Sequence, residues 1–222
     1  YQNINREINN RLTYSDLIIY LVQLFQDTRI NYLEIGVSVL KNFMQINNQL
    51  EDSNLVAYDI NNIVNKFSSD FTQTQRNTVR DFYQSKKGKN NIYYFKGDVL
   101  SNQDADNFEK INEFKYDFVM SDAMHTKEGI LSEYENIIKG KLNNKFILYY
   151  DDLDFPELEN AAIQVFKKLQ INFENLSFYS FWIYGWVGQH EKMHKNGFIT
   201  NLPVKEYLDL GEIKLPFFNR IT

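Results

Sequence analysis

The chain has 222 residues, a net charge of −5 and no cysteine. Its length suits one domain with its own core, and the absence of cysteine excludes disulfides, thiolate metal sites and a cysteine nucleophile. The acidic balance argues against a nucleic-acid surface, which needs a basic face. The chain also contains no run of about 18 apolar residues, the length that a helix needs to span a bilayer. Residues 1–12 lack a hydrophobic signal core. We therefore expect a cytoplasmic protein without nucleic-acid or membrane partners.

Strand and helix patterns alternate along most of the chain. A helix with several candidate caps at 13–16 is predicted to continue to residue 25. Short apolar runs predict buried strands at 32–36, 55–59, 92–95, 116–120 and 145–150, and helices are predicted at 72–85, 129–138 and 157–169. Apolar strands separated by helices are typical of a parallel sheet covered on both faces.

The last part of the domain has a different pattern. Two strands are predicted at 177–184 and 197–201, joined by a short loop. Two strands with a tight connection are antiparallel, so we expect an antiparallel edge on the parallel sheet. The domain is expected to cover residues 31–205, with a helical segment at 1–30 that serves as a lid or as a contact between copies of the chain, and a C-terminal tail at 206–222.

Acidic residues follow several of the predicted strands. In open α/β sheets, ligands bind at the carboxyl ends of the strands. We therefore expect these acids to converge on one edge of the sheet. The alternative for each acid alone is a helix N-cap, which aspartate favours. The six acids are Glu34, Asp59, Asp98, Asp122, Asp151 and Asp152.

The turn after the first predicted strand suggests a nucleoside site. Gly36 allows a ligand to approach the backbone closely, and the turn continues to Ser38. Asp59 ends the next strand, where a carboxylate can accept hydrogen bonds from ribose hydroxyls. The signal is weak by itself, because the second and third glycines of a full dinucleotide-binding loop are missing.

These strand ends resemble those of class I S-adenosylmethionine-dependent methyltransferases over most of the chain, from about residue 14 to 202. The resemblance implies a Rossmann-like α/β fold, with a mostly parallel seven-stranded sheet, an antiparallel last strand and helices on both faces. It implies that Glu34 and Gly36, with the turn to Ser38, lie beside the methionine part of the cofactor, that Asp59 holds the ribose and that Asp98 lies near the adenine. The chain departs from the family at Ser38 and Leu40, where many members carry glycine.

Two further segments resemble the macrocin-type sugar O-methyltransferases. They are 121–126, which contains Asp122 and His125, and 149–152, which ends in Asp151 and Asp152. The resemblance implies that the three aspartates hold a divalent metal and that His125 is the general base. This chain departs from that pattern at Ala123, where relatives carry glycine, and at Asp151, where glutamate is frequent.

Such a site suits methyl transfer to an aliphatic hydroxyl, which is barely acidic by itself. A dication held by carboxylates lowers the pKa of a bound hydroxyl, and oxygen ligands favour Mg²⁺, with Mn²⁺ or Ca²⁺ as alternatives. A neutral imidazole can accept the proton. We therefore expect an S-adenosylmethionine-dependent, Mg²⁺-dependent O-methyltransferase that acts on a small hydroxylated molecule such as a sugar.

Three alternatives remain open from the sequence. The first is a non-catalytic binding module with the same fold, which the missing glycines at Ser38 and Leu40 favour. The second is a methyltransferase without a metal, in which the acids cap helices. The third is a zinc peptidase, because residues 190–194 match the pattern H-E-x-x-H. Two flanking glycines leave little room for the long helix that this motif needs, and no histidine follows His194 as a third ligand.

Overall fold

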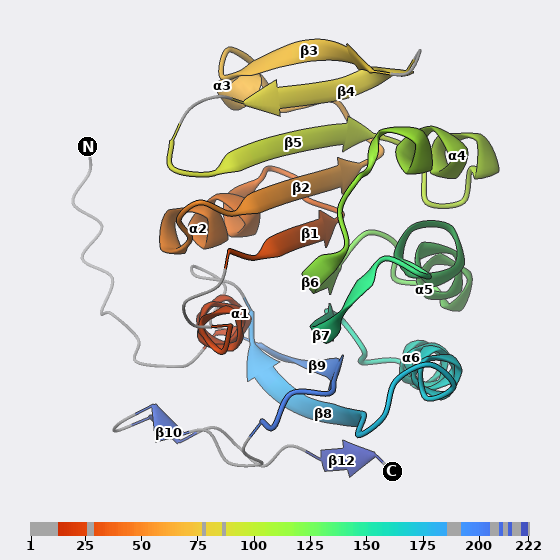
Figure 1. Ribbon diagram of the computed structural model, residues 1–222. Helices are drawn as coiled ribbons and strands as arrows, with labels where there is room; N and C mark the ends of the chain where they lie inside the picture. Colours follow the sequence, from red (N-terminus) through yellow and green to blue (C-terminus); the bar gives the residue numbers. More distant parts are fainter. Residues whose placement is uncertain are drawn as a thin grey trace.

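The computed structural model describes residues 13–25, 29–76, 79–85, 88–185 and 192–204, with the short segments 209–210, 213–214 and 219–221. Its centre is a ten-stranded sheet with helices on both faces (Figure 1). The order of the strands across the sheet is β12-β8-β9-β7-β6-β1-β2-β5-β4-β3. The expectation of an α/β fold with a mostly parallel centre is confirmed.

Five neighbouring strands in the middle of the sheet run parallel. They are β5 (Asn91–Lys96), β2 (Asn54–Asp59), β1 (Asn31–Ile35), β6 (Tyr116–Ser121) and β7 (Leu142–Tyr150). Most side chains of β1, β2 and β6 are buried, as expected for strands covered on both faces. Ile35 at the end of β1 pairs with Tyr58 of β2 and Ser121 of β6, so the carboxyl ends of these strands lie at one edge.

The strand β9 (Met193–Thr200) lies inside the sheet and not at its edge. It pairs antiparallel with β7 on one side and with β8 (Ser177–Tyr184) on the other. The expected antiparallel last strand is therefore confirmed, but the prediction that this pair forms the edge is wrong. The short strand β12 (Asn219–Ile221) covers the outer side of β8.

The described residues of 72–85, which were predicted as a helix, belong to two paired strands. β3 (Phe71–Arg76) and β4 (Val79–Ser85) pair antiparallel and extend the sheet beyond β5. Threonine, valine and aromatic residues are frequent in this segment and favour strands. The rings of Phe71 and Tyr83 pack against Tyr94 of β5, with ring centroids 6.2 and 6.3 Å away. These two strands and β12 raise the number of strands from the expected seven to ten.

The helices form two groups that cover opposite faces of the sheet (Figure 1). One group is α4 (Asn102–Ile111), α5 (Lys127–Glu133) with its π-helical continuation η1 (Tyr134–Ile138), and α6 (Pro156–Leu169). The other is α1 (Tyr14–Gln23) and α2 (Lys41–Gln49), and a single turn, α3 (Asn65–Ser68), follows β2. Helices are thus present where 129–138 and 157–169 predict them.

The N-terminal helix α1 is part of the core of this domain. The side chain of Thr13 accepts a hydrogen bond from the backbone of Asp16 at 3.3 Å, and the Asp16 carboxylate accepts one from the backbone of Thr13 at 2.9 Å, which is a capping box. Leu17, Ile18 and Leu21 are fully buried against the sheet. Residues 1–12 lie outside the described residues, so the role of 1–30 as a lid or a contact between copies stays a prediction.

The C-terminal segment 206–222 is described only in part. Two short strands, β10 (Asp209–Leu210) and β11 (Ile213–Lys214), pair with each other, and β12 joins the main sheet. Across all the described segments, no helix combines the length and the apolar character that crossing a bilayer requires.

Candidate active site

A cavity of about 710 Å³ lies at the carboxyl ends of β1, β6 and β7. Glu34, Asp122 and Asp151 line it from the strand ends, and Tyr14 and Ser15 line it from the start of α1. Sites for small molecules typically measure about 300–1,000 Å³. The cavity is thus large enough for a nucleoside cofactor or a small substrate, and four of the six predicted acids, Asp152 included, line it.

Gly36 lies where the turn after β1 touches the turn after β6. Its φ of +86° is in the left-handed region, and a Cβ at this position would lie 2.3 Å from the backbone oxygen of Asp122 and 2.4 Å from the Cα of Ala123. Its N–H donates to the backbone oxygen of Tyr58 at 2.8 Å. The glycine therefore permits both the turn and the close approach of the two segments that carry site residues.

The loop after Gly36 keeps a backbone shape that glycine would adopt most easily. Ser38 and Leu40 have φ values of +46° and +63°, although left-handed backbone costs a non-glycine residue about 1–2 kcal/mol. The backbone N–H of Ser38 donates to the carboxylate of Asp59 at 2.8 Å, and Leu40 is fully buried. These contacts oppose the strain at the two positions and hold the loop against β2 and the core.

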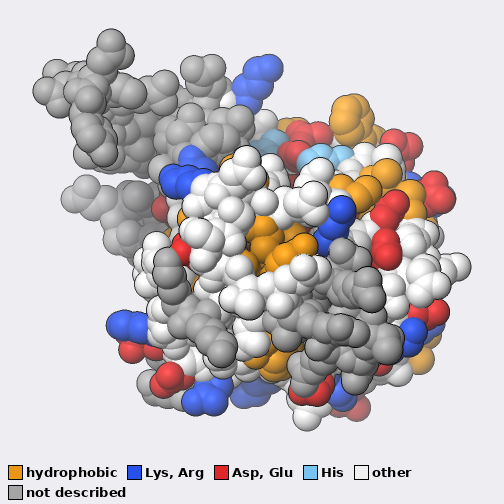
Figure 2. All heavy atoms as spheres, turned by 90° about the horizontal axis from the view of Figure 1, so that it is seen from above, with side chains coloured by type: hydrophobic (Ala, Val, Ile, Leu, Met, Phe, Trp, Pro, Cys, Tyr) orange, Lys and Arg blue, Asp and Glu red, His pale blue; other side chains and the backbone are white. Residues whose placement is uncertain are grey.

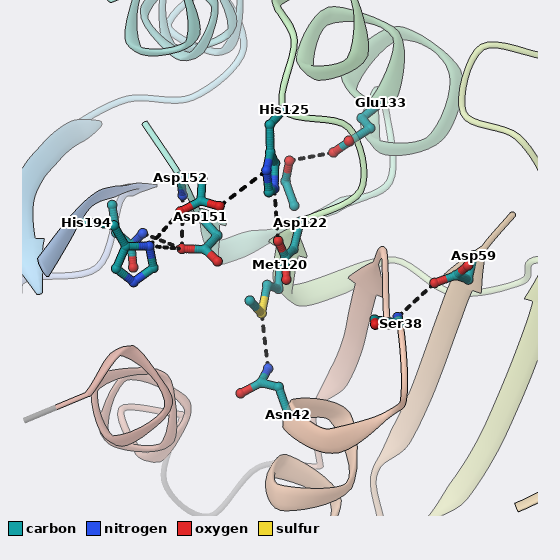
Figure 3. Close-up of polar contacts among 12 residues, drawn as sticks. Ser38, Asn42, Asp59, Met120, Asp122, His125, Glu133, Asp151, Asp152 and His194 are labelled. Atoms are coloured by element: carbon teal, nitrogen blue, oxygen red, sulfur yellow. Dashed lines mark hydrogen bonds and ion pairs between the residues drawn. The ribbon is translucent and has the colours of Figure 1, made fainter. Parts of the chain in front are cut away.

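Asp59 and Asp98 lie at the same edge of the sheet but do not line the cavity. Figure 3 shows Asp59 turned toward Ser38 and away from the acidic cluster. Its other carboxylate oxygen accepts from the backbone of Asn61 at 2.8 Å. Asp98 accepts from the backbone of Leu100 at 2.9 Å in a local turn. Their roles at the ribose and the adenine stay predictions.

Glu34 is a buried carboxyl in the wall of the cavity. Its Oε2 accepts hydrogen bonds from the hydroxyl of Tyr32 at 2.6 Å and from the side-chain amide of Asn42 at 3.0 Å. Burial raises the pKa of Glu34 to about 8, even though both hydrogen bonds oppose the rise. A Glu34 that is neutral at pH 7 can donate a hydrogen bond as well as accept one.

His125 lies between two carboxylates (Figure 3). Its Nε2 is 3.1 Å from Oδ1 of Asp122, and its Nδ1 is 3.2 Å from Oδ2 of Asp152. The hydrogen bond to Asp122 raises the pKa of His125 to about 9. Without a cation beside these carboxylates, the imidazole is protonated at neutral pH.

His194 lies on the other side of Asp152. Its Nδ1 is 2.6 Å from Oδ1 of Asp152 and 3.2 Å from Oδ1 of Asp151. Burial, the largest single influence, opposes a charge on His194, but the bond to Asp152 and the charges of Asp151, Asp152 and Asp154 together outweigh it, and the pKa is raised. Burial raises the pKa of Asp151 to about 7, whereas the bond from His194 lowers the pKa of Asp152. Figure 2, which views the molecule from above, shows histidine side chains beside acidic ones near one edge of the face drawn there.

Two buried residues, Asn196 and Glu133, support the strand ends that carry Asp151 and Asp122. The side-chain amide of Asn196 on β9 donates to Oδ1 of Asp151, and its oxygen accepts from the hydroxyl of Tyr149 at 2.7 Å. Glu133 of α5 accepts from the hydroxyl of Ser121, the residue before Asp122. Asn196 therefore holds the carboxylate of Asp151, and Glu133 holds the residue before Asp122, and neither of these two side chains lines the cavity.

His194, Asn196, Tyr14 and Ser15 are site residues that sequence reasoning missed. A histidine between two glycines near the last predicted strand was a usable signal, but the pattern assigned it to a loop or to a peptidase motif. Residues 190 and 191 of that motif lie outside the described residues. His194 lies on the strand β9, and the helix that a zinc peptidase needs is therefore not formed there.

The described residues fit a polar ligand and a cation. The Oγ of Ser15 and the Oδ1 of Asn42, both in residues that line the cavity, are buried and have no hydrogen-bond partner in the described part of the chain. Asp151, Asp152 and His194 each place one donor atom within 4.8 Å of the others. Asp122 does not join this group and reaches it through His125.

No protein-family profile and no curated sequence matches the chain, but solved structures share its fold. TomG from Streptomyces achromogenes, an O-methyltransferase of tomaymycin synthesis in complex with S-adenosylmethionine, is 13% identical, with a TM-score of 0.53 over 84% of this chain and 78% of that one. A putative caffeoyl-CoA O-methyltransferase from Staphylococcus aureus is 14% identical, with a TM-score of 0.51 over 87% and 85%. A putative O-methyltransferase from Klebsiella pneumoniae is 11% identical, with a TM-score of 0.54 over 87% and 82%. The chain therefore has the class I methyltransferase fold, and the likeness does not single out the macrocin-type enzymes.

Proposed function

Starting from this methyltransferase fold, we propose that the chain is an S-adenosylmethionine-dependent O-methyltransferase of a small hydroxylated molecule such as a sugar. The observation that carries the proposal is the cavity in which the glycine turn after β1 meets the carboxylates of β6 and β7. A broad acidic surface without a cavity would suit a binding module better. We keep the expectation that the protein acts in the cytoplasm, on a small molecule and not on a nucleic acid.

The turn after β1 is the proposed site of the cofactor. Glu34 and Gly36 line the cavity beside the place of the methionine part, and Ser38 belongs to the same wall. Asp59 supports this wall through the backbone of Ser38, and its remaining lone pairs are assigned to the ribose. Asp98, the last of the proposed cofactor residues, is assigned to the adenine side.

His125 is the proposed general base. In methyl transfer, the acceptor oxygen bonds to the methyl carbon, the bond from carbon to sulfur breaks, and the hydroxyl proton leaves to a base. His125 can take that proton only when it is neutral, but the neighbouring carboxylates of Asp122 and Asp152 hold it protonated. A divalent cation bound by Asp122, Asp151 and Asp152 would lower the pKa of a hydroxyl beside it and would offset the charge that holds His125 protonated.

Calorimetry with S-adenosylhomocysteine, with and without Mg²⁺, tests the proposal. We expect binding in both conditions, because Gly36 and Glu34 line the cavity without involving the acidic cluster. The Gly36→Ala variant, whose new methyl group would displace the turn, is expected to bind more weakly. Absence of binding at millimolar cofactor would refute the enzyme and favour the non-catalytic module.

A metal-independent methyltransferase is a second candidate, and one observation favours it. The two imidazoles of His125 and His194 already contact all three aspartates and oppose their charge. Methyl transfer that persists in EDTA and in the Asp152→Ala variant would favour this candidate. Loss of activity in EDTA that Mg²⁺ or Mn²⁺ restores would favour the metal-dependent one.

A further inference from the structure

His194 reaches the acidic cluster from β9, the strand that lies between β7 and β8. β9 pairs with β7 so that Gly197 lies opposite Tyr150, the residue just before Asp151. His194 is therefore placed beside the end of β7, and its ring lies edge-on to the ring of Tyr14 with centroids 5.6 Å apart. The position of the imidazole is thus set by the sheet and by a helix, and not by a loop.

The distances in this group match the ligand set of one ion. The Nδ1 of His194 is 2.6 Å from Asp152 and 3.2 Å from Asp151. Neighbouring ligands of an octahedral ion, each at about 2.1 Å, lie about 3 Å apart. Only small shifts would separate the three donor atoms enough to hold an ion.

The surroundings of Asp151 resemble the support that a metal ligand receives. Asp151 is buried and accepts a hydrogen bond from Asn196, which is itself fully buried and is bonded to Tyr149. Such bonds orient a ligand and raise its affinity for metal. Asp152 has a φ of +51°, a strained backbone that turns its carboxylate toward both histidines.

The nitrogen donor decides which ion fits best. Mg²⁺ prefers sites made of oxygen ligands only. Imidazole suits iron, nickel, copper and zinc, whereas manganese also takes sites made of oxygen ligands, and the affinity of such a site rises from Mn²⁺ to Cu²⁺. A site with two carboxylates and one imidazole therefore discriminates against Mg²⁺.

We propose that Asp151, Asp152 and His194 bind a divalent first-row transition metal ion, with the Nδ1 of His194 as a direct ligand, more tightly than Mg²⁺. The inference rests on the proposed function, since it names the ion of the same site. It differs from the ligand set expected from the sequence in one respect, because it gives His194 the place that Asp122 has there. Asp122 remains the partner of His125.

Metal binding to the whole chain, stripped with EDTA and free of cofactor, provides the test. Calorimetry is expected to give tighter binding of Mn²⁺ than of Mg²⁺, because Mg²⁺ prefers oxygen ligands and a transition metal ion accepts the imidazole. Pulsed electron paramagnetic resonance of bound Mn²⁺ is expected to show modulation from one directly bound ¹⁴N. This signal needs no variant, so it tests the proposal even if a substitution at His194 disturbs folding.

Two histidine variants locate the nitrogen. His194→Ala is expected to abolish the ¹⁴N signal and to weaken Mn²⁺ binding by about 100-fold or more, because loss of even an indirect partner typically costs about 10–100-fold. Its affinity for Mg²⁺ is expected to change much less. The matched control is His125→Ala, which also removes an imidazole from Asp152 and is expected to retain the ¹⁴N signal.

Three outcomes would overturn the inference. They are Mn²⁺ bound without a nitrogen signal, a signal lost in His125→Ala but kept in His194→Ala, and no metal binding at all. Binding of S-adenosylhomocysteine, measured in parallel, separates the two proposals. If it is intact when the nitrogen signal is absent, only the metal inference fails. If it is absent while nitrogen-bound Mn²⁺ is present, only the proposed methyl transfer fails.

Discussion

The contact of Gly36 with the segment after β6 predicts a large and specific effect of a single methyl group. In the Gly36→Ala variant, the Cβ would meet the Asp122 oxygen at 2.3 Å and the Ala123 Cα at 2.4 Å. All of these atoms belong to the backbone and cannot rotate away. The two turns must therefore move apart at the point where they form the wall of the cavity.

The expected loss of stability has two parts. A left-handed φ costs alanine about 1–2 kcal/mol, and overpacking of a tight contact costs about 1–3 kcal/mol more. The free energy of unfolding is therefore expected to fall by about 2–5 kcal/mol. Gly140 is a matched control, because its φ is +76° but, its chain neighbours aside, no atom of the described residues lies within 4 Å of the place of its Cβ. Gly140→Ala is expected to lose only the first part, about 1–2 kcal/mol.

Urea unfolding of the wild type and the two variants measures this difference. Calorimetry with S-adenosylhomocysteine is the second readout, and it is expected to show weaker binding for Gly36→Ala and unchanged binding for Gly140→Ala. Equal losses of stability in the two variants would refute the close approach of the turns. Normal cofactor binding by Gly36→Ala would refute the place of the cofactor beside this turn.

Three other predictions follow from the site and its supports. His125→Ala is expected to lower the turnover number about 10²–10⁴-fold while the affinity for S-adenosylhomocysteine stays unchanged, and equal activity would exclude His125 as the base. In the metal-free protein, charged His125 stabilises the fold fully below its ordinary pKa of 6.5, and this contribution is lost as the pH rises through about 9; the urea midpoints of wild type and His125→Ala should converge over that range. Ser38→Gly is expected to raise the free energy of unfolding by about 0.5–1 kcal/mol, since it removes left-handed strain at an exposed side chain, and a decrease would contradict this reasoning.

The parallel part of the fold was predictable because its strands are buried on both faces. Short runs such as 32–36 and 116–120 are apolar at most positions and do not alternate with polar residues, as expected for strands buried on both faces, and each ends at a polar turn. The same runs placed Asp122, Asp151 and Asp152 at one edge of the sheet. Parallel strands bring their carboxyl ends together, so this inference did not require the order of the strands.

The errors arose where pairing with distant residues decides the structure. The local sequence of 72–85 does not show what this segment packs against. Its described residues form strands because the open edge of β5 offers hydrogen bonds and aromatic rings. The place of β9 between β7 and β8 is equally invisible in a local pattern. His194 and Asn196 were missed because the last strand was predicted to begin only at residue 197, whereas β9 begins at Met193 and carries both residues to Asp151.

The position of β9 between β7 and β8 also has a consequence for biosynthesis. A ribosome completes β7 and β8 before it adds Met193–Thr200, so the growing chain exposes the unpaired edges of both strands for that interval. Such edges recruit strands from other molecules and promote aggregation. Chaperone protection is expected to matter most in this interval. The interval ends when β9 pairs with β7 and β8, and the same step brings the imidazole of His194 to Asp151 and Asp152.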